Sequence, residues 1–198
     1  MADQYFAARP SARRREETIR VALRGHTFVF DTDAGVFARG KLDRGTELLA
    51  QHLTLAPDAH VLDIGCGYGV LGIVAATLAP NGRVVMTDVN ERAIDLAARN
   101  VRANAVPHAD ARVGPFYEPV AGETFDAIVS NPPIRAGKEA VFRIVDEAPG
   151  HLRRGAFLWM VARTRQGARS LEAHIAERLG ACATVARGSG YRVFRAGL

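Results

Sequence analysis

The sequence predicts an α/β fold: a seven-stranded, mostly parallel sheet with an antiparallel C-terminal hairpin and a short N-terminal β extension. From about Val61 onward, short apolar runs alternate with helical patterns, which is the signature of βαβ units. The last two strand-like segments are joined by residues 188–190, a three-residue link that contains two glycines. Such a link makes a hairpin, so the final strand runs antiparallel to its neighbour. Before Val61, residues 17–31 resemble two short strands.

The individual elements follow from apolar periodicity and from the residues that interrupt it. Apolar side chains at i, i+3, i+4 and i+7 predict a helix over 91–104, and the continuous apolar run 157–161 predicts a buried central strand. Pro149-Gly150 is expected to kink or interrupt the helix before it. The predicted strands of the main sheet are 61–64, 83–88, a segment near Ala111, 125–130, 157–161, 182–187 and 191–195. The predicted helices are 45–53, 71–78, 91–104, a segment around 141–148, and 167–179.

Length and composition predict one domain over residues 1–198, with an N-terminal extension at 1–45 and the catalytic core at 46–198. The chain has 198 residues and 48% hydrophobic content, enough for one substantial core. No signal peptide or membrane-spanning run is recognised, so a cytoplasmic location is expected. Cys66 and Cys182 are far apart and lie in no CxxC motif or Cys/His cluster, which predicts neither a disulfide nor a metal site.

Charge is distributed unevenly along the chain. Residues 1–45 carry a net +3, residues 46–134 a net −5 and residues 135–198 a net +7. Basic segments that flank an acidic centre are expected if the flanks face a polyanion, so contact with nucleic acid is predicted. The alternative is an arginine-favouring codon usage that produces solvated basic faces, since nearly all the basic residues are arginine.

A glycine-rich turn follows the first strand of the main sheet. It runs from Asp63 to Gly69, with Gly65, Gly67 and Gly69 removing Cβ atoms that would keep a ligand off the backbone. The spacing is GxGxG, whereas dinucleotide-binding folds use GxGxxG. Asp63 would oppose a pyrophosphate but attracts a cationic amino group, which S-adenosylmethionine has and NAD lacks. Cys66 is interpreted as a packing residue of the loop, because nothing near it in the sequence would lower its pKa.

An acidic residue, Asp88, ends the second strand of the main sheet. A carboxylate at this place accepts both hydroxyls of a ribose, and Val89 beside it is positioned to line an adenine pocket. The alternative is that Asp88 only caps the helix that begins near Glu91.

The segment Ser130-Asn131-Pro132-Pro133-Ile134 directly follows another strand of the sheet. Consecutive prolines stiffen the turn, and the Asn131 side-chain oxygen together with the Pro132 carbonyl would accept both hydrogens of an –NH₂ group. These bonds would aim the nitrogen lone pair at a methyl sulfonium for in-line SN2 displacement, so catalysis would be mainly positioning. Read alone, the segment is also a simple loop breaker.

Together these motifs resemble those of amino-methylating, Rossmann-like class I methyltransferases. The motifs are LDIGCGYG at 62–69, TDVN at 87–90 and SNPPI at 130–134; the segments 35–37, 42–46, 131–139, 164–170 and 190–194 resemble small relatives of the RsmC-type ribosomal RNA guanine-N2 methyltransferases. The resemblance covers nearly the whole chain and implies methylation of guanine N2 in RNA. It further implies that Phe37 and Thr46 approach the cofactor and that residues 131–134 hold the base.

Two departures from that family bear on the cofactor and the acceptor. Similar proteins carry an Asp or Asn after the third strand, where this chain has 113–117 without one; Asp110, a few residues earlier, is a substitute to consider. Ile134 stands where adenine-N6 and glutamine methyltransferases have an aromatic residue, which favours guanine N2. Methylation of adenine or of protein glutamine, a dinucleotide-dependent oxidoreductase and a non-catalytic RNA-binding module stay open as alternatives.

Basic residues close to the catalytic loop and to the next strand are expected to contact RNA phosphates and position the substrate. They are Arg135, Lys138, Arg163, Arg165 and Arg169. The expected partner is RNA, ribosomal RNA above all, with no membrane and no metal, and the protein is expected to be a monomer or homodimer. Tyr191, Trp159 and the histidines are assigned to core or surface roles, since none lies in a motif.

Overall fold

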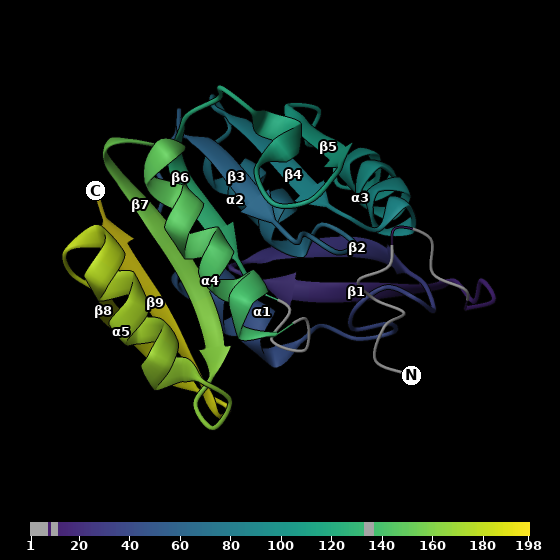
Figure 1. Ribbon diagram of the computed structural model, residues 1–198. Coiled ribbons are helices and arrows are strands. Elements are labelled where there is room, and N and C mark those ends of the chain that lie inside the picture. The colour runs from purple at the N-terminus through teal and green to yellow at the C-terminus, as the bar shows by residue number, and fades with distance from the viewer. Residues whose placement is uncertain (1–7, 9–11, 133–136) are drawn as a thin grey trace.

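A computed structural model describes residue 8 and residues 12–132 and 137–198, and its main sheet has seven strands in the order β5-β4-β3-β6-β7-β9-β8 (Figure 1). The strands from β5 to β7 are parallel to one another, whereas β9 is antiparallel to both of its neighbours. The strands are β3 (His60–Ile64), β4 (Arg83–Asp88), β5 (Ala109–Val113), β6 (Phe125–Ser130), β7 (Leu152–Arg163), β8 (Ala183–Gly188) and β9 (Tyr191–Gly197). The predicted fold class, including the C-terminal hairpin, is confirmed.

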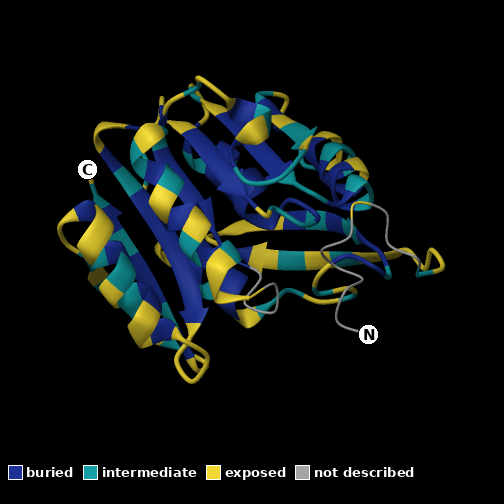
Figure 2. Ribbon diagram, viewed as in Figure 1, coloured by how far each residue is buried: buried dark blue, intermediate teal, exposed yellow. Residues whose placement is uncertain are grey.

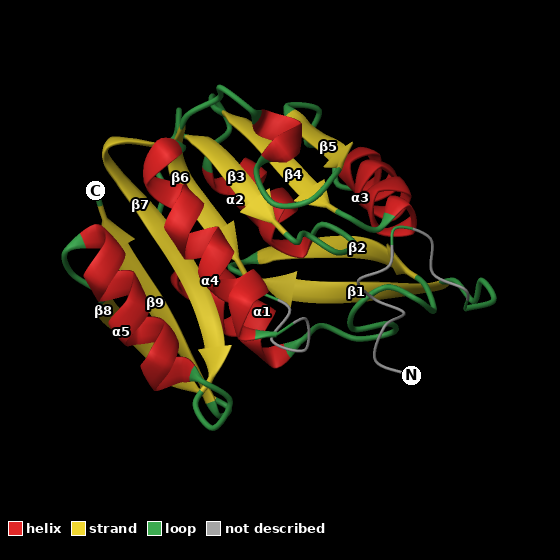
Figure 3. Cartoon of the chain, in the orientation of Figure 1, coloured by secondary structure: helices red, strands yellow, loops and turns green. Residues whose placement is uncertain are grey.

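Helices cover both faces of this sheet (Figure 3). They are α1 (Arg44–His52), α2 (Val70–Leu78), α3 (Glu91–Ala103), α4 (Lys138–Glu147) and α5 (Ala168–Leu179). Successive strand residues point to opposite faces, so Val61 packs with α1, α2 and α3, while Leu62 packs with α4 and α5. The inner strands β3, β4 and β6 are buried on both sides, β5 and β8 at the two edges of the sheet are more exposed, and the outer surfaces of α4 and α5 are exposed (Figure 2).

In the C-terminal half, one element differs from its prediction and another agrees with it. β7 extends over Leu152–Arg163 rather than 157–161, because its first residues continue the pairing with β6 past an irregularity after Phe125. Exposed Arg153 and Arg154 interrupt the apolar run there, so the pattern concealed the start of the strand. The helix before it ends at Glu147 and is followed by a 3-10 turn over Ala148–Gly150, as the Pro-Gly pair predicted.

The N-terminal extension is a separate two-stranded antiparallel sheet of β1 (Glu17–Leu23) and β2 (His26–Thr32). Asn100 of α3 and Asn104, the residue that caps the end of this helix, hold β2 in place. Asn100 accepts a hydrogen bond from the Asp31 amide (2.8 Å) and donates one to the Asp31 carbonyl (3.0 Å). Asn104 pairs with Val29 in the same way at 2.9 and 2.7 Å. These amides take the place of a neighbouring strand, so the loop after β2 has a fixed starting point.

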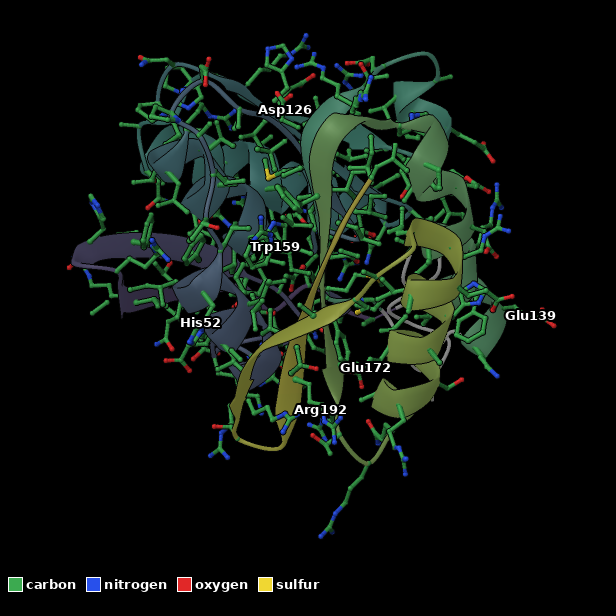
Figure 4. All side chains as sticks on the ribbon, turned by 90° about the vertical axis from the view of Figure 1, so that its left-hand side faces the viewer. His52, Asp126, Glu139, Trp159, Glu172 and Arg192 are labelled. Carbon is green, nitrogen blue, oxygen red and sulfur yellow. The ribbon has the colours of Figure 1, made fainter. Side chains whose placement is uncertain are left out.

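Trp159 of β7 lies in the interior of the molecule, as predicted (Figure 4). Arg192 and Glu172 form an ion pair of 3.4 Å near the end of the sheet where the β8–β9 turn lies. None of the helices in the described segments combines the length and apolar character that crossing a membrane requires.

Candidate functional site

A cavity of about 760 Å³ opens at the carboxyl ends of the parallel strands. Its walls come from the loops after β2, β3, β4, β5 and β6, and from α4 and the facing ends of β7 and β9. Open α/β sheets bind ligands at this edge. The predicted site residues that line the cavity are Phe37, Gly65, Gly67, Asp88, Val89, Asn131, Pro132 and Arg163. Pro133, Ile134 and Arg135 lie outside the described residues.

The glycine loop divides into two functionally different parts. Gly65 and Gly67 have φ of 70° and 56°, a Cβ on either would meet no atom within 4 Å, and both face the cavity. Gly69 also has a positive φ, but a Cβ there would lie 3.2 Å from the Cβ of Ala97 and 3.3 Å from the Sδ of Met86. Gly69 therefore serves the packing of α2 against its neighbours, and only the first two glycines present open backbone to a ligand.

Asp63 is buried just before the glycine loop and does not line the cavity itself. Its Oδ2 accepts a hydrogen bond from the Gly72 amide (2.8 Å) in the first turn of α2, a helix that has no side-chain cap. Its Oδ1 has no partner among the described residues. Burial, with a further contribution from the nearby charge of Asp88, raises the pKa of Asp63 to about 7. A cation at the cavity floor would relieve both the missing partner and the repulsion between the carboxylates.

Asp88 is held by backbone amides at the end of β4. Its Oδ2 accepts from the Gly67 amide and its Oδ1 from the Asn90 amide, both at 2.9 Å. Burial raises the pKa of Asp88, while these hydrogen bonds oppose the shift. The cap of α3 is Asn90, whose side chain accepts from the Arg92 and Ala93 amides. Asp88 is thus not the helix cap, and each of its oxygens keeps a lone pair for a ligand hydroxyl.

The wall where an adenine ring would lie is aromatic and apolar rather than acidic. Phe37, which is 50% exposed, and Phe116 both line the cavity. Asp110 does not: it lies early in β5, paired in register with Val85, and its carboxylate binds Arg112 at 2.9 Å. The suggestion that Asp110 replaces the missing acid is therefore wrong, because the residue lies near the amino end of β5, whereas the cavity lies at the carboxyl ends of the strands.

Asn131 is fixed in orientation by residues that come from the other end of the chain. Its Nδ2 donates to Oδ2 of Asp43 (3.0 Å) and to Oγ1 of Thr46 (2.9 Å). Because the Asp43 carboxylate only accepts, the –NH₂ group must face it, which leaves Oδ1 as the free acceptor of this cavity-lining residue. Asp43 is held in turn as the N-cap of α1 by the Gly45 (2.8 Å) and Thr46 (3.0 Å) amides.

Tyr191 and Arg163 extend this network, and sequence reasoning missed the part that Tyr191 plays in it. Tyr191 donates a longer bond of 3.4 Å to Oδ1 of Asp43, and Arg163 Nε donates to the Tyr191 hydroxyl at 2.8 Å. Tyr191 pairs with Arg163 in the β7–β9 register and lies on the cavity wall. The sequence indicated only that Tyr191 begins the last strand. That this strand pairs with β7, and so brings Tyr191 to Arg163, is a long-range feature that no local pattern indicates.

The other predicted residues are arranged around this centre in different ways. Cys66 is partly buried, and burial with the charges of Asp88 and Asp63 raises the pKa of its thiol, which agrees with a packing residue. Thr46 is buried and bonds Asn131, and it does not line the cavity. Lys138 lies over the Phe142 ring at 4.7 Å, outside the cavity. Arg165 lines a second groove, which also includes Arg163.

Comparisons with known proteins show which family and which relatives this chain resembles. Residues 27–195 match the model of the methyltransferase small domain. An uncharacterized protein, YbxB of Bacillus subtilis, is 33% identical over 99% of this chain and 98% of its own length. The ribosomal RNA small subunit methyltransferase C of Pseudomonas fluorescens is 37% identical over 82% of this chain but only 48% of its own length.

Among solved structures, the chain is similar to the Thermus thermophilus 16S rRNA N2 G1207 methyltransferase (RsmC) in complex with AdoMet and guanosine. The TM-score is 0.82 and the identity 27%, over 92% of this chain and 50% of that one. This chain therefore spans about half the length of the RsmC-type relatives that it matches.

Proposed function

This chain belongs to the methyltransferase small domain family and is an S-adenosylmethionine-dependent methyltransferase, and from that premise we propose that it methylates guanine N2 in ribosomal RNA. The observation that carries the proposal is that Asn131 lines the cavity while its –NH₂ group is held by Asp43 and Thr46, so that its side-chain oxygen is left as an acceptor for a ligand. An exocyclic –NH₂ group offers two hydrogens and one lone pair, and an acceptor of this kind binds the hydrogens while leaving the lone pair free.

The residues at the glycine loop fit the cofactor on three counts. Open backbone at Gly65 and Gly67 admits close approach, Asp88 offers acceptors to the ribose hydroxyls, and the unpartnered Oδ1 of Asp63 favours a cationic ligand. Phe37 and Phe116 would bound the adenine, and Val89 would contact it from the end of β4. The bound cofactor supplies a methyl group activated by the positive charge of its sulfonium.

The proposed role of the Asn131 segment is to position the amine. Asn131 Oδ1 and the Pro132 carbonyl would accept the two amine hydrogens, with Pro133 and Ile134 completing the base contact. These contacts would hold the amine nitrogen with its lone pair free to receive the methyl group that the cofactor would supply, and the proton lost from the nitrogen would pass to solvent. Such positioning contributes to rate without a strong general base.

Guanine is favoured over other amine acceptors by similarity rather than by geometry. The Thermus thermophilus protein is described with guanosine, and the Pseudomonas fluorescens relative as a ribosomal RNA methyltransferase. Adenine N6 and protein glutamine offer the same –NH₂ chemistry, so the acceptor has to be decided by product analysis.

The decisive experiment is to incubate the protein with isotopically methyl-labelled S-adenosylmethionine and ribosomal RNA from a strain that lacks the gene. We expect label in N2-methylguanosine after digestion to nucleosides and mass spectrometry, and the modified position would be mapped by comparing RNA from the two strains. Label in N6-methyladenosine, or in protein glutamine when whole ribosomes are used, would replace guanine as the acceptor. Calorimetric titration with S-adenosylhomocysteine and with NAD checks the cofactor class; binding of NAD alone would exclude the proposal.

A further inference from the structure

A second groove, of about 670 Å³, adjoins the cavity and is lined by Arg44, Arg163 and Arg165. Arg163, Gln166 and Tyr191 line both, so the groove begins where the wall next to Asn131 ends. Its other lining residues are Thr164, Gln166, Ser189, Gly190 and Tyr191, and no acidic residue of the described segments is part of it. We call the surface formed by these three arginines the basic groove.

Two of these arginines have no charged partner among the described residues. Within the described part of the chain, the side chains of Arg44 and Arg165 form neither an ion pair nor a hydrogen bond. Arginines elsewhere do: Arg153 binds Asp126 at 2.8 Å and Arg178 binds Asp146 at 2.9 Å. Three guanidinium groups around one groove repel one another, and an anion in the groove would remove that repulsion.

Arg44 also stands where local helix energetics disfavour it. It is the first residue of α1, directly after the Asp43 cap, and a cation at a helix N-terminus opposes the helix dipole. Where a residue breaks a local rule without a compensating contact, a functional constraint is the usual reason. The constraint here is consistent with an anion that approaches both Arg44 and the residues beyond it.

We infer that the basic groove binds the phosphodiester backbone of a single-stranded RNA beside the nucleotide whose base enters the cavity. The inference rests on the proposed function and names where the rest of that substrate lies. A base that reaches Asn131 inside a cavity has left its helical stack, which single strands and loops permit most readily. Its backbone then remains at the rim, and the rim shared by cavity and groove is formed by Arg163, Gln166 and Tyr191.

The test compares two double variants that lose the same charge. Arg44→Ala/Arg165→Ala removes the unpaired arginines of the groove, while Arg163 is left because it bonds Tyr191. Arg102→Ala/Arg154→Ala is the control: Arg102 is near the end of α3 and Arg154 near the start of β7, and both side chains are exposed at the opposite edge of the sheet. Binding of a fluorescently labelled ten-nucleotide single-stranded RNA is measured by anisotropy between low and moderate salt.

We expect the groove variant to lose at least about tenfold in RNA affinity, and the slope of log K against log salt to fall by about 1.4, for two lost phosphate contacts. The control variant should keep the wild-type affinity and slope. S-adenosylhomocysteine should bind both variants as it binds the wild type, which shows that each is folded. Equal losses in the two variants, or no binding of RNA by the wild type, would overturn the inference, and so would equally tight binding of polyglutamate.

Because binding is measured without methyl transfer, the two proposals fail in different ways. If RNA binds through the groove but no guanine is methylated, the proposed acceptor is wrong and the groove stands. If guanine is methylated and the groove variant binds RNA like the wild type, the groove is wrong and the acceptor stands.

Discussion

The two sides of the cavity are built by opposite means. The glycine-loop side, from Asp63 to Val89, is local: its backbone amides and two carboxylates come from consecutive strands and are bonded to one another. The Asn131 side, consisting of Asp43, Thr46, Asn131 and Tyr191, is joined by side chains, with 88 positions between Asp43 and Asn131 and 148 between Asp43 and Tyr191. The difference indicates that the hydrogen bonds of the glycine-loop side are built within one βαβ unit, whereas the hydrogen bonds that fix Asn131 depend on the complete fold.

The largest effect is expected from breaking the Asn131 side at its centre. Asn131→Ala removes the acceptor for the amine, and loss of the reacting geometry should lower kcat by at least about 100-fold. The affinity for S-adenosylhomocysteine should hardly change, because the glycine-loop side has its own hydrogen bonds. Initial rates at saturating cofactor and calorimetry measure the two quantities. Asn81→Ala, at an exposed turn after α2, is the matched control. A kcat within a few-fold of wild type would show that Asn131 does not orient the acceptor.

A substitution on the glycine-loop side should weaken cofactor binding more than it lowers kcat. Asp88→Ala removes acceptors for the ribose hydroxyls, and hydrogen bonds to a charged group contribute ~1.5–3 kcal/mol each. The Kd for S-adenosylhomocysteine should therefore rise about 10- to 100-fold for each bond lost, with kcat at saturating cofactor falling less. Asp88→Asn retains one oxygen that accepts a backbone amide and should have an intermediate Kd. If kcat fell as it does for Asn131→Ala, the two sides would not be independent.

The same division explains what the sequence could predict. Strand and helix periods, the GxGxG spacing and the positions of Asp88 and Asn131 are local patterns, and the fold they predicted is confirmed. The place of β9 between β7 and β8 is not a local feature, so the role of Tyr191 could not be predicted. The bond from Asn131 to Asp43 could not be predicted either, because it joins residues 88 positions apart in the sequence. Asp110 was misassigned because a strand's register, and not distance along the sequence, decides which residue reaches the carboxyl edge.

The pH dependence of cofactor affinity tests the role of Asp63 on the glycine-loop side. With the pKa of Asp63 raised to about 7, the carboxyl is largely neutral at pH 6 and charged at pH 8. The ammonium group of S-adenosylhomocysteine favours the charged form of Asp63, so the affinity for this ligand should rise with pH up to about 7, by at most about tenfold per unit, and then level off. Asp63→Asn, which can still accept from the Gly72 amide, should show a much shallower dependence.

The stability of the ligand-free protein should have the opposite trend in the same range. An acid whose folded pKa exceeds its unfolded value holds a proton that the unfolded chain has released. From about pH 4 to pH 7, Asp63 therefore makes the folded state less stable as the pH rises. A cofactor affinity that fell between pH 6 and pH 7 would contradict the proposed interaction of Asp63 with a cation.

The smallest effect decides which side of the cavity Thr46 serves. Resemblance to the RNA methyltransferases implies a contact with the cofactor, whereas its hydroxyl accepts the Asn131 amide at 2.9 Å and lies outside the cavity lining. Thr46→Val keeps the shape and removes one hydrogen bond of ~0.5–1.5 kcal/mol, so kcat should fall about 3- to 10-fold with the Kd for S-adenosylhomocysteine unchanged. Thr46→Ser, which restores the acceptor, should recover the rate. A raised Kd with normal kcat would instead assign Thr46 to the cofactor, and the Asn131 side would then rest on Asp43 alone.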